Sequence, residues 1–111
     1  MKTLFWLGSA KEDIRLLSDM ARQEAGHQLH LVQMGLEPSD CKNMVGVGLG
    51  VKEIRIHAQN EYRILYVARY AEGVYVLHVF TKKTRATSER DINLARARLR
   101  SLLIWRQQHG Y

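Results

Sequence analysis

The fold is decided by residues 51–81, which read VKEIRIHAQNEYRILYVARYAEGVYVLHVFT. At its start, Ile54, Ile56 and Ala58 alternate with polar side chains, and this period of two predicts a strand with one buried face. Residues 62–70 and 74–81 are rich in β-branched and aromatic side chains and predict two further strands. Because the intervening turns at 59–61 and 72–73 are short, the three strands are expected to form an antiparallel meander.

The segments on either side predict helices and one more strand. Residues 2–7 predict a short N-terminal strand, and Ser9 precedes Glu12 with the spacing of a capping box. Apolar side chains then recur at helical spacing as far as Gly35, which predicts a helix pair with a kink near residues 18–19. Residues 37–50 are expected to be a loop. Ser88 is expected to cap a last helix, with Asp91 three positions on, and its apolar stripe comprises Ile92, Ala95, Leu99, Leu102 and Leu103.

This order of elements predicts an α+β fold: an N-terminal strand, a helix pair, a three-stranded antiparallel meander and a C-terminal helix, with the helices on one sheet face. The length of 111 residues suits one domain, expected over residues 1–111. No apolar run approaches the ~18 residues needed to span a bilayer. The single cysteine, Cys41, permits neither an internal disulfide nor a cysteine zinc site. These features favour the reducing cytoplasm and no membrane association.

The charge of the chain is concentrated at its end. Residues 1–78 hold nine basic and nine acidic side chains, whereas residues 79–111 hold eight basic and two acidic ones, so the whole excess of +6 lies there. A neutral body with a basic last third predicts nucleic acid or an acidic protein as partner, and the alternative is a solvated helix face.

Two other patterns lack the context that their chemistry needs. Gly46, Gly48 and Gly50 are not followed by the Lys-Ser/Thr of a phosphate-binding loop, so they indicate a flexible connector. His27 and His30 lie one helical turn apart without a third ligand at suitable spacing, so no metal site is predicted.

A cationic set on the meander carries the strongest chemical signal, and it comprises Arg55, Arg63, Lys82 and Lys83. Adjacent strands lie ~4.8 Å apart, so an antiparallel meander can gather these side chains on one patch. Arginine grips two phosphate oxygens and lysine offers a compact charge, which together suit a phosphodiester. The structural alternative is a cross-strand ion pair of Glu53 with Arg63 or Arg69.

Three stretches of the chain resemble one known family. These are KEIRI at residues 52–56, EYRILY at 61–66 and VLHVFTKKT at 76–84. They resemble the RelE/ParE superfamily, and most of all the phage-derived, HigB-like branch of type II toxin–antitoxin toxins. The similarity covers nearly the whole chain, and the Phe-x-Lys-Lys-Thr sequence followed by a capped helix is its most specific part.

The resemblance implies a ribosome-dependent endoribonuclease that needs no metal or other cofactor and cuts mRNA. In such enzymes the 2′-hydroxyl of the RNA attacks the adjacent phosphate and leaves a 2′,3′-cyclic phosphate. Carried over to this chain, the resemblance assigns Arg55, Arg63 and Lys83 to hold the phosphate and neutralise the charge of the transition state.

The chain also departs from RelE-type members. Glu53 stands where those members have a lysine and is a candidate general base, with His57 or His78 as alternatives. The aromatic residue that stacks on a base in those members has no counterpart near Glu89.

The basic last third is expected to bind RNA through Lys82, Arg85, Arg90, Arg98 and Arg100. The partners implied by the resemblance are a cognate helix-turn-helix antitoxin, the ribosome with its mRNA, and operator DNA through the antitoxin complex only. Two alternatives share the fold: a ParE-like, non-catalytic inhibitor of DNA gyrase, and a basic RNA-binding module without cleavage.

Overall fold

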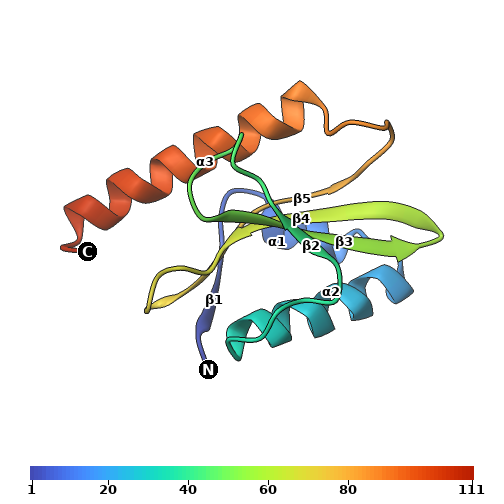
Figure 1. The fold of residues 1–111 in the computed structure, drawn as a ribbon, viewed down its shortest axis with the longest axis horizontal. Helices are drawn as coiled ribbons and strands as arrows, with labels where there is room; N and C mark the ends of the chain where they lie inside the picture. The colour runs from blue at the N-terminus through green and yellow to red at the C-terminus, as the bar shows by residue number, and fades with distance from the viewer.

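The computed structural model describes residues 1–111 and contains a five-stranded mixed sheet between two layers of helices (Figure 1). The elements in chain order are β1 (Thr3–Trp6), α1 (Ala10–Arg15), α2 (Asp19–Gln33), β2 (Cys41–Asn43), β3 (Val51–Ala58), β4 (Asn60–Val67), β5 (Gly73–Thr81) and α3 (Glu89–Gln108). The strands lie in the order β1-β5-β4-β3-β2. This confirms the predicted α+β fold.

The three long strands form the predicted antiparallel meander. β3 pairs with β4 and β4 with β5, whereas β1 joins the far edge parallel to β5. Gln59 alone makes the first turn, with a φ of 68°, so β4 begins two residues earlier than expected. The prediction of a plain loop at residues 37–50 is wrong in part, because residues 41–43 pair with the edge of β3. A strand of three residues is too short to show a period of two.

The helices begin and end close to the predicted positions. The predicted kink is confirmed as a break between α1 and α2, where the Ser18 side chain accepts a hydrogen bond from the Ala21 N–H and caps α2. Ser88 caps α3 in the same way through the Asp91 N–H. The capping box at Ser9 does not form, because its hydroxyl donates to Asp13 and accepts from Arg98 instead.

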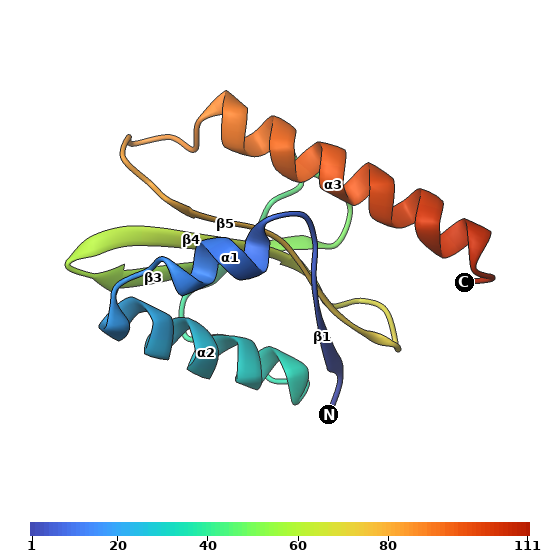
Figure 2. The ribbon, with the colours of Figure 1, turned by 180° about the vertical axis from the view of Figure 1, so that it is seen from behind.

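The expectation that the helices share one face of the sheet is wrong. α1 and α2 pack on one face and α3 on the other, as the ribbon shows from both sides (Figures 1 and 2). β4 and β5 are apolar on both faces, and a single layer of helices would leave one of these faces in water. Leu103 is nearly half exposed rather than part of the apolar stripe.

A β-bulge in β5 decides which side chains face α3. Leu65 pairs with His78 and the next residue, Tyr66, pairs with Val76, so Leu77 is the extra residue. Leu77 packs in the core beneath α3, and the side chain of His78 bonds to Asp91 of α3. Without the bulge, His78 would follow the alternation of Val74 and Val76 toward α1 and α2. Bulges commonly re-aim a side chain in this way.

Candidate functional site

A charged cluster lies on the α3-facing side of the sheet, where the β3–β4 hairpin and the end of β5 meet. The strand register places Arg55, Arg63 and Phe80 side by side in one row, and Glu53, Leu65 and His78 in the next. The hairpin and the loop 82–88 that leads to α3 lie at the same end of the molecule in both views (Figures 1 and 2). We call the charged cluster the set Asp40, Glu53, Arg55, His57, Glu61 and Arg63.

Two members of the charged cluster are buried charges. Glu53 is 1% exposed and Arg63 is 5% exposed. The Arg63 Nε lies 3.7 Å from the Glu53 Oε1, and the Arg55 Nε donates to the same oxygen at 3.4 Å. The cross-strand pair of Glu53 with Arg63 therefore exists, whereas Arg69 forms no ion pair. One carboxylate thus holds both arginines in place.

The charged cluster closes into a ring of alternating acids and bases. His57 faces Asp40 with Nε2 and Glu61 with Nδ1, each at 2.7 Å. Glu61 accepts from the Arg63 guanidinium at 3.0 Å, and Asp40 lies 3.9 Å from that of Arg55. The ring contains three carboxylates and two guanidiniums, so its net charge is zero only when His57 is protonated. The protonation of His57 therefore sets the net charge of the ring.

The two hydrogen bonds of His57 act on its titration. They raise its pKa above the ordinary value, with the bond to Asp40 as the largest cause and the bond to Glu61 next. The pKa of Glu61 is lowered in turn, chiefly by its hydrogen bond to His57. Because both ring nitrogens face carboxylates, both are placed to donate. His57 is also more than half exposed, so it combines a favoured proton with access from solvent.

A second histidine, His78, lies beside the charged cluster and is buried. The side chain of His78 is 7% exposed, and its Nε2 lies 2.7 Å from the Asp91 Oδ1 in the first turn of α3. Its ring stacks on Phe80 at a centroid distance of 4.8 Å. The contact with Asp91 joins the start of α3 to the sheet next to the charged cluster.

Three buried side-chain polar atoms lack a hydrogen-bond partner, and all three lie on this face. They are the Glu53 Oε2, the Arg63 Nε and the His78 Nδ1. Buried polar groups are nearly always bonded, because an unmade bond costs about 1–3 kcal/mol. Such atoms concentrate where a protein keeps polar groups for a ligand, so this face is the candidate functional site.

The loop 82–88 adds positive charge next to the charged cluster. The Lys82 N–H donates to the Glu61 carbonyl at 2.7 Å, which places Lys82 directly beside the hairpin. A small pocket of about 160 Å³ lies here, lined by Thr81, Lys82, Lys83, Thr84, Phe80, Ser88 and Asp91. Neither lysine forms an ion pair, and the same is true of Arg85 and Arg90. These cations are therefore free to meet an anion.

The structure gathers some of the predicted residues and separates others. Glu53, Arg55 and Arg63 contact one another, and Lys82 and Lys83 lie at the adjoining loop. Arg98 lies elsewhere along α3, where it donates to the Leu77 carbonyl and the Ser9 hydroxyl. Arg100 is exposed on α3 and makes no recorded contact with the charged cluster.

Sequence reasoning missed three acidic residues of this region. The sequence predicts a loop at Asp40, a turn at Glu61 and only a helix-capping role for Asp91. Asp91 does lie at the capping position, but it also holds His78. The sequence marks Asp40 and Glu61 only as polar residues next to a predicted turn.

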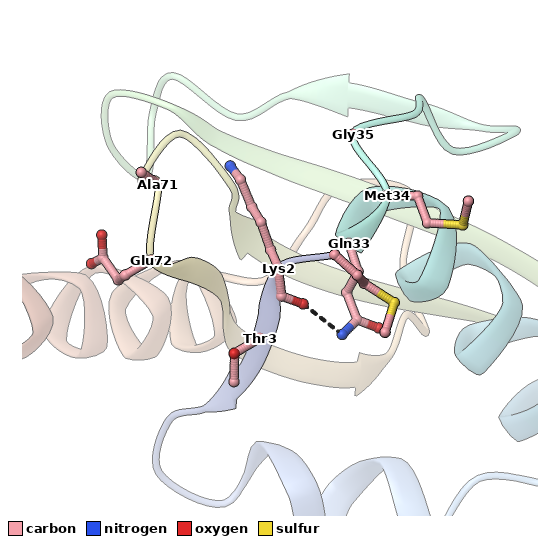
Figure 3. Close-up of a pocket in the computed structure, with 8 residues that line it drawn as sticks. Lys2, Thr3, Gln33, Met34, Gly35, Ala71 and Glu72 are labelled. Carbon is pink, nitrogen blue, oxygen red and sulfur yellow. Dashed lines mark hydrogen bonds between the residues drawn. The ribbon is translucent and has the colours of Figure 1, made fainter.

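A separate hollow at the N-terminus lacks free chemical groups. It measures about 560 Å³ and lies between the start of β1, the end of α2 and the β4–β5 turn (Figure 3). Gln33 donates its side-chain amide to the Lys2 carbonyl there. Lys2 bonds to the Ala68 carbonyl, and Glu72 bonds to Tyr75 and Arg106. Both charged side chains are thus already engaged.

No group of three or more His, Cys, Asp or Glu side chains has the geometry to hold a metal ion. None of the helices is both long enough and apolar enough to cross a membrane.

The comparisons with known proteins agree with the resemblance seen in the sequence. The model of the family described as phage derived protein Gp49-like (DUF891) matches residues 12–100. A search of curated proteins found no match. The matched residues include most of α1, the whole of α2 and of the charged cluster, and most of α3. The chain therefore belongs to the Gp49-like family of phage-derived proteins, which is part of the RelE/ParE-like, HigB-like toxin group.

Proposed function

We propose that this protein is the toxin of a type II toxin–antitoxin module and acts as a ribosome-dependent endoribonuclease on mRNA. The observation that supports this most is the pair of guanidiniums, Arg55 and Arg63, held on one carboxylate beside lysines that form no ion pair. A phosphodiester brings oxygens for the guanidinium groups and negative charge for the lysines.

In this proposal the RNA supplies its own nucleophile. The 2′-hydroxyl gives up its proton to solvent as its oxygen forms a bond to the adjacent phosphorus. The bond from phosphorus to the 5′-oxygen breaks, that oxygen takes up a proton, and a 2′,3′-cyclic phosphate remains. Arg55 and Arg63 hold the non-bridging oxygens, and Lys83 neutralises the charge that develops in the transition state. Glu53 is too deeply buried to reach the RNA in this arrangement and orients the two arginines.

The leaving 5′-oxygen needs a proton, and His57 is the proposed donor. It is exposed, and the neighbouring carboxylates raise its pKa, which keeps it protonated to higher pH. A phosphate that enters beside Arg55 would displace Asp40, whose contact with Arg55 is the longest in the ring, and would free the His57 Nε2. Glu61 on Nδ1 and the incoming anion would then favour the proton in place of Asp40. His78 is a less suitable donor, since its Nε2 is already held by Asp91 of α3.

The proposed partners follow from the distribution of charge. A helix-turn-helix antitoxin would neutralise the toxin by placing an acidic segment over the loop 82–88, and operator DNA would be bound only through that complex. The ribosome and its mRNA would meet the same basic loop and the exposed arginines Arg85, Arg90 and Arg100.

The deciding experiment compares two targets with one preparation of the folded protein. Ribosomes programmed with a defined mRNA are expected to yield new RNA ends within the translated frame, each carrying a 2′,3′-cyclic phosphate. A parallel assay measures supercoiling by purified DNA gyrase and is expected to show no inhibition. Intact mRNA together with blocked supercoiling would replace this proposal with the gyrase inhibitor, and intact mRNA with tight RNA binding would leave a non-cleaving RNA-binding module.

A further inference from the structure

An apolar groove lies at the other end of α3, away from the charged cluster. It has a volume of about 510 Å³ and separates β1 from the second half of α3, and its lining is Phe5, Trp6, Leu7, Gly8, Tyr75, Arg98, Ser101, Leu102 and Trp105. This half of α3 extends past the sheet, on the side opposite to the β3–β4 hairpin (Figure 1). β1 is an edge strand, so no further strand covers the groove from outside.

The walls of the groove are exposed aromatic side chains. Phe5 is 37% exposed and Trp105 is 44% exposed. Phe5 stacks on Tyr75 at a centroid distance of 4.9 Å, and a Cβ at Gly73 would lie 2.4 Å from the Phe5 ring. Gly73 therefore makes room for the Phe5 ring, which remains partly exposed to solvent. Exposed apolar surface of this kind is unfavourable in the isolated protein and is typical of a docking surface.

Arg98 is the only charged residue that lines the groove, and no carboxylate contacts it. Its guanidinium is half-buried and donates only to the uncharged Leu77 carbonyl and Ser9 hydroxyl. Gly8 permits this approach, because a Cβ there would lie 2.4 Å from the Arg98 Nε. The groove thus combines apolar walls with one unbalanced positive charge.

These features select among the possible occupants. A second copy of this chain would bring two basic α3 helices together, since residues 79–111 carry the whole excess of +6. Nucleic acid would meet apolar rings in place of a row of cations. We propose that the groove docks an acidic amphipathic segment of a protein partner, with bulky apolar side chains against Phe5 and Trp105 and a carboxylate on Arg98. Helices that lay an apolar face into a groove bind in this way.

The chain carries its own reporter for this inference. Trp105 lines the groove with a partly exposed ring, whereas Trp6 borders the groove and packs against the core beneath α1 and α2, so the emission of Trp105 reports on this site. The probe is a phage-displayed library of random 15-residue peptides, panned on the full-length protein. Enriched peptides are expected to carry apolar residues at helical spacing together with Asp or Glu. Their synthetic versions should shift the tryptophan emission with a saturable profile.

Two variants with the same change in charge locate the binding. Ser101→Glu places a carboxylate inside the groove and is expected to weaken the enriched peptides by about 30-fold, as loss of a binding hot spot does. Gln108→Glu adds the same charge on an exposed part of α3 outside the groove and is expected to change the affinity less than about twofold. Circular dichroism checks that both variants are folded.

Several results would overturn the inference. They are the absence of any enriched peptide, enrichment of basic peptides, and equal weakening by the two variants. Sedimentation that shows a dimer which Ser101→Glu dissociates would assign the groove to a second copy instead. None of these readouts uses RNA, so their outcome is independent of whether the proposed nuclease activity is confirmed.

Discussion

The two faces of the sheet are built from the same strands and differ in chemistry. Toward α1 and α2, the strands and these two helices form a core of 15 buried apolar residues. The buried polar residue on that side, Gln28, bonds to Glu24 and Ser39. Toward α3 the buried set mixes apolar residues with Glu53, Arg63 and His78, and each of these three keeps an unsatisfied atom.

The difference indicates a division of labour between the faces. A face whose polar groups are all bonded contributes stability through apolar burial. A face with unsatisfied buried charges loses stability, and here its guanidiniums and the lysines beside them give an anion a place to bind. Neighbouring residues of β4 belong to opposite faces, since Ile64 packs toward α1 and α2 and Arg63 joins the charged cluster. Substitutions at these two positions therefore test the division directly.

The largest expected effect is on the apolar face. Ile64 is fully buried, and Ile64→Ala is expected to lower the free energy of unfolding by about 2–5 kcal/mol, because it removes buried methyl groups and leaves a cavity. Urea denaturation measures this loss. The RNA cleavage per folded molecule is expected to stay near that of the wild type, and a hundredfold loss of cleavage in the folded fraction would contradict the division of labour.

The next effect is on the charged face and concerns catalysis. Arg63→Lys keeps a positive charge beside Glu53 but loses the planar fork that grips two phosphate oxygens. Cleavage on programmed ribosomes is expected to fall by about 10²–10³-fold, the range for loss of one preorganised donor.

The matched control is Arg15→Lys, an exposed arginine on α1 at the opposite face, which is expected to leave cleavage unchanged. Arg55→Ala and Lys83→Ala should also lose activity, and the double change should be less than additive if both groups hold one phosphate. Equal cleavage by the wild type and Arg63→Lys would remove Arg63 from the site.

Much of the fold could be predicted because long elements carry periodic signals. The meander, the kinked helix pair and the capped α3 all follow from spacing over eight or more residues. β2 could not be predicted, because its three residues gain their structure from the edge of β3. The second helical layer was also missed, although the continuous apolar runs of β4 and β5 are typical of strands that are buried on both faces.

The candidate site could be predicted only in part for a related reason. Glu53, Arg55 and Arg63 lie at strand positions whose side chains point to the same face of the sheet, so the period of two alone brings them together. His78 reaches the same face only through the bulge at Leu77, which no local pattern in the sequence indicates. Asp40 joins the charged cluster through the pairing of β2, which was itself missed.

A smaller effect concerns the unpaired cations of the loop. Lys83 and Arg85 are exposed and form no ion pair, so each phosphate contact that they make should release counterions. The slope of log affinity against log salt for a single-stranded RNA is expected to shrink by about 0.7 for each contact that an alanine substitution removes. Lys11→Ala, on α1, should leave the slope unchanged. A slope that also stays unchanged in Lys83→Ala and Arg85→Ala would place RNA elsewhere.

The smallest expected effect concerns the pH dependence of stability. The pKa of His57 is raised in the folded protein, so its contribution is complete below its ordinary value of 6.5 and is lost as the pH rises through the raised pKa. The pKa of Glu61 is lowered, so its contribution is present above 4.5 and is lost as the pH falls through the lowered pKa. The ring of charges should therefore stabilise the hairpin most between these two values.

The substitution His57→Gln tests this because it removes the titrating group and keeps a polar side chain. The urea midpoint of the wild type should exceed that of His57→Gln at about pH 6, and this difference should shrink at about pH 9, where the imidazole is neutral. The difference should be small, since His57, Asp40 and Glu61 are all partly exposed and screened by water. His27→Gln changes an exposed histidine on α2 that forms no ion pair; it is the matched control and should leave the urea midpoint of the wild type unchanged. If the difference between the wild type and His57→Gln were the same at both pH values, the charge of His57 would not stabilise the ring, and its proposed role as proton donor would lose its electrostatic support.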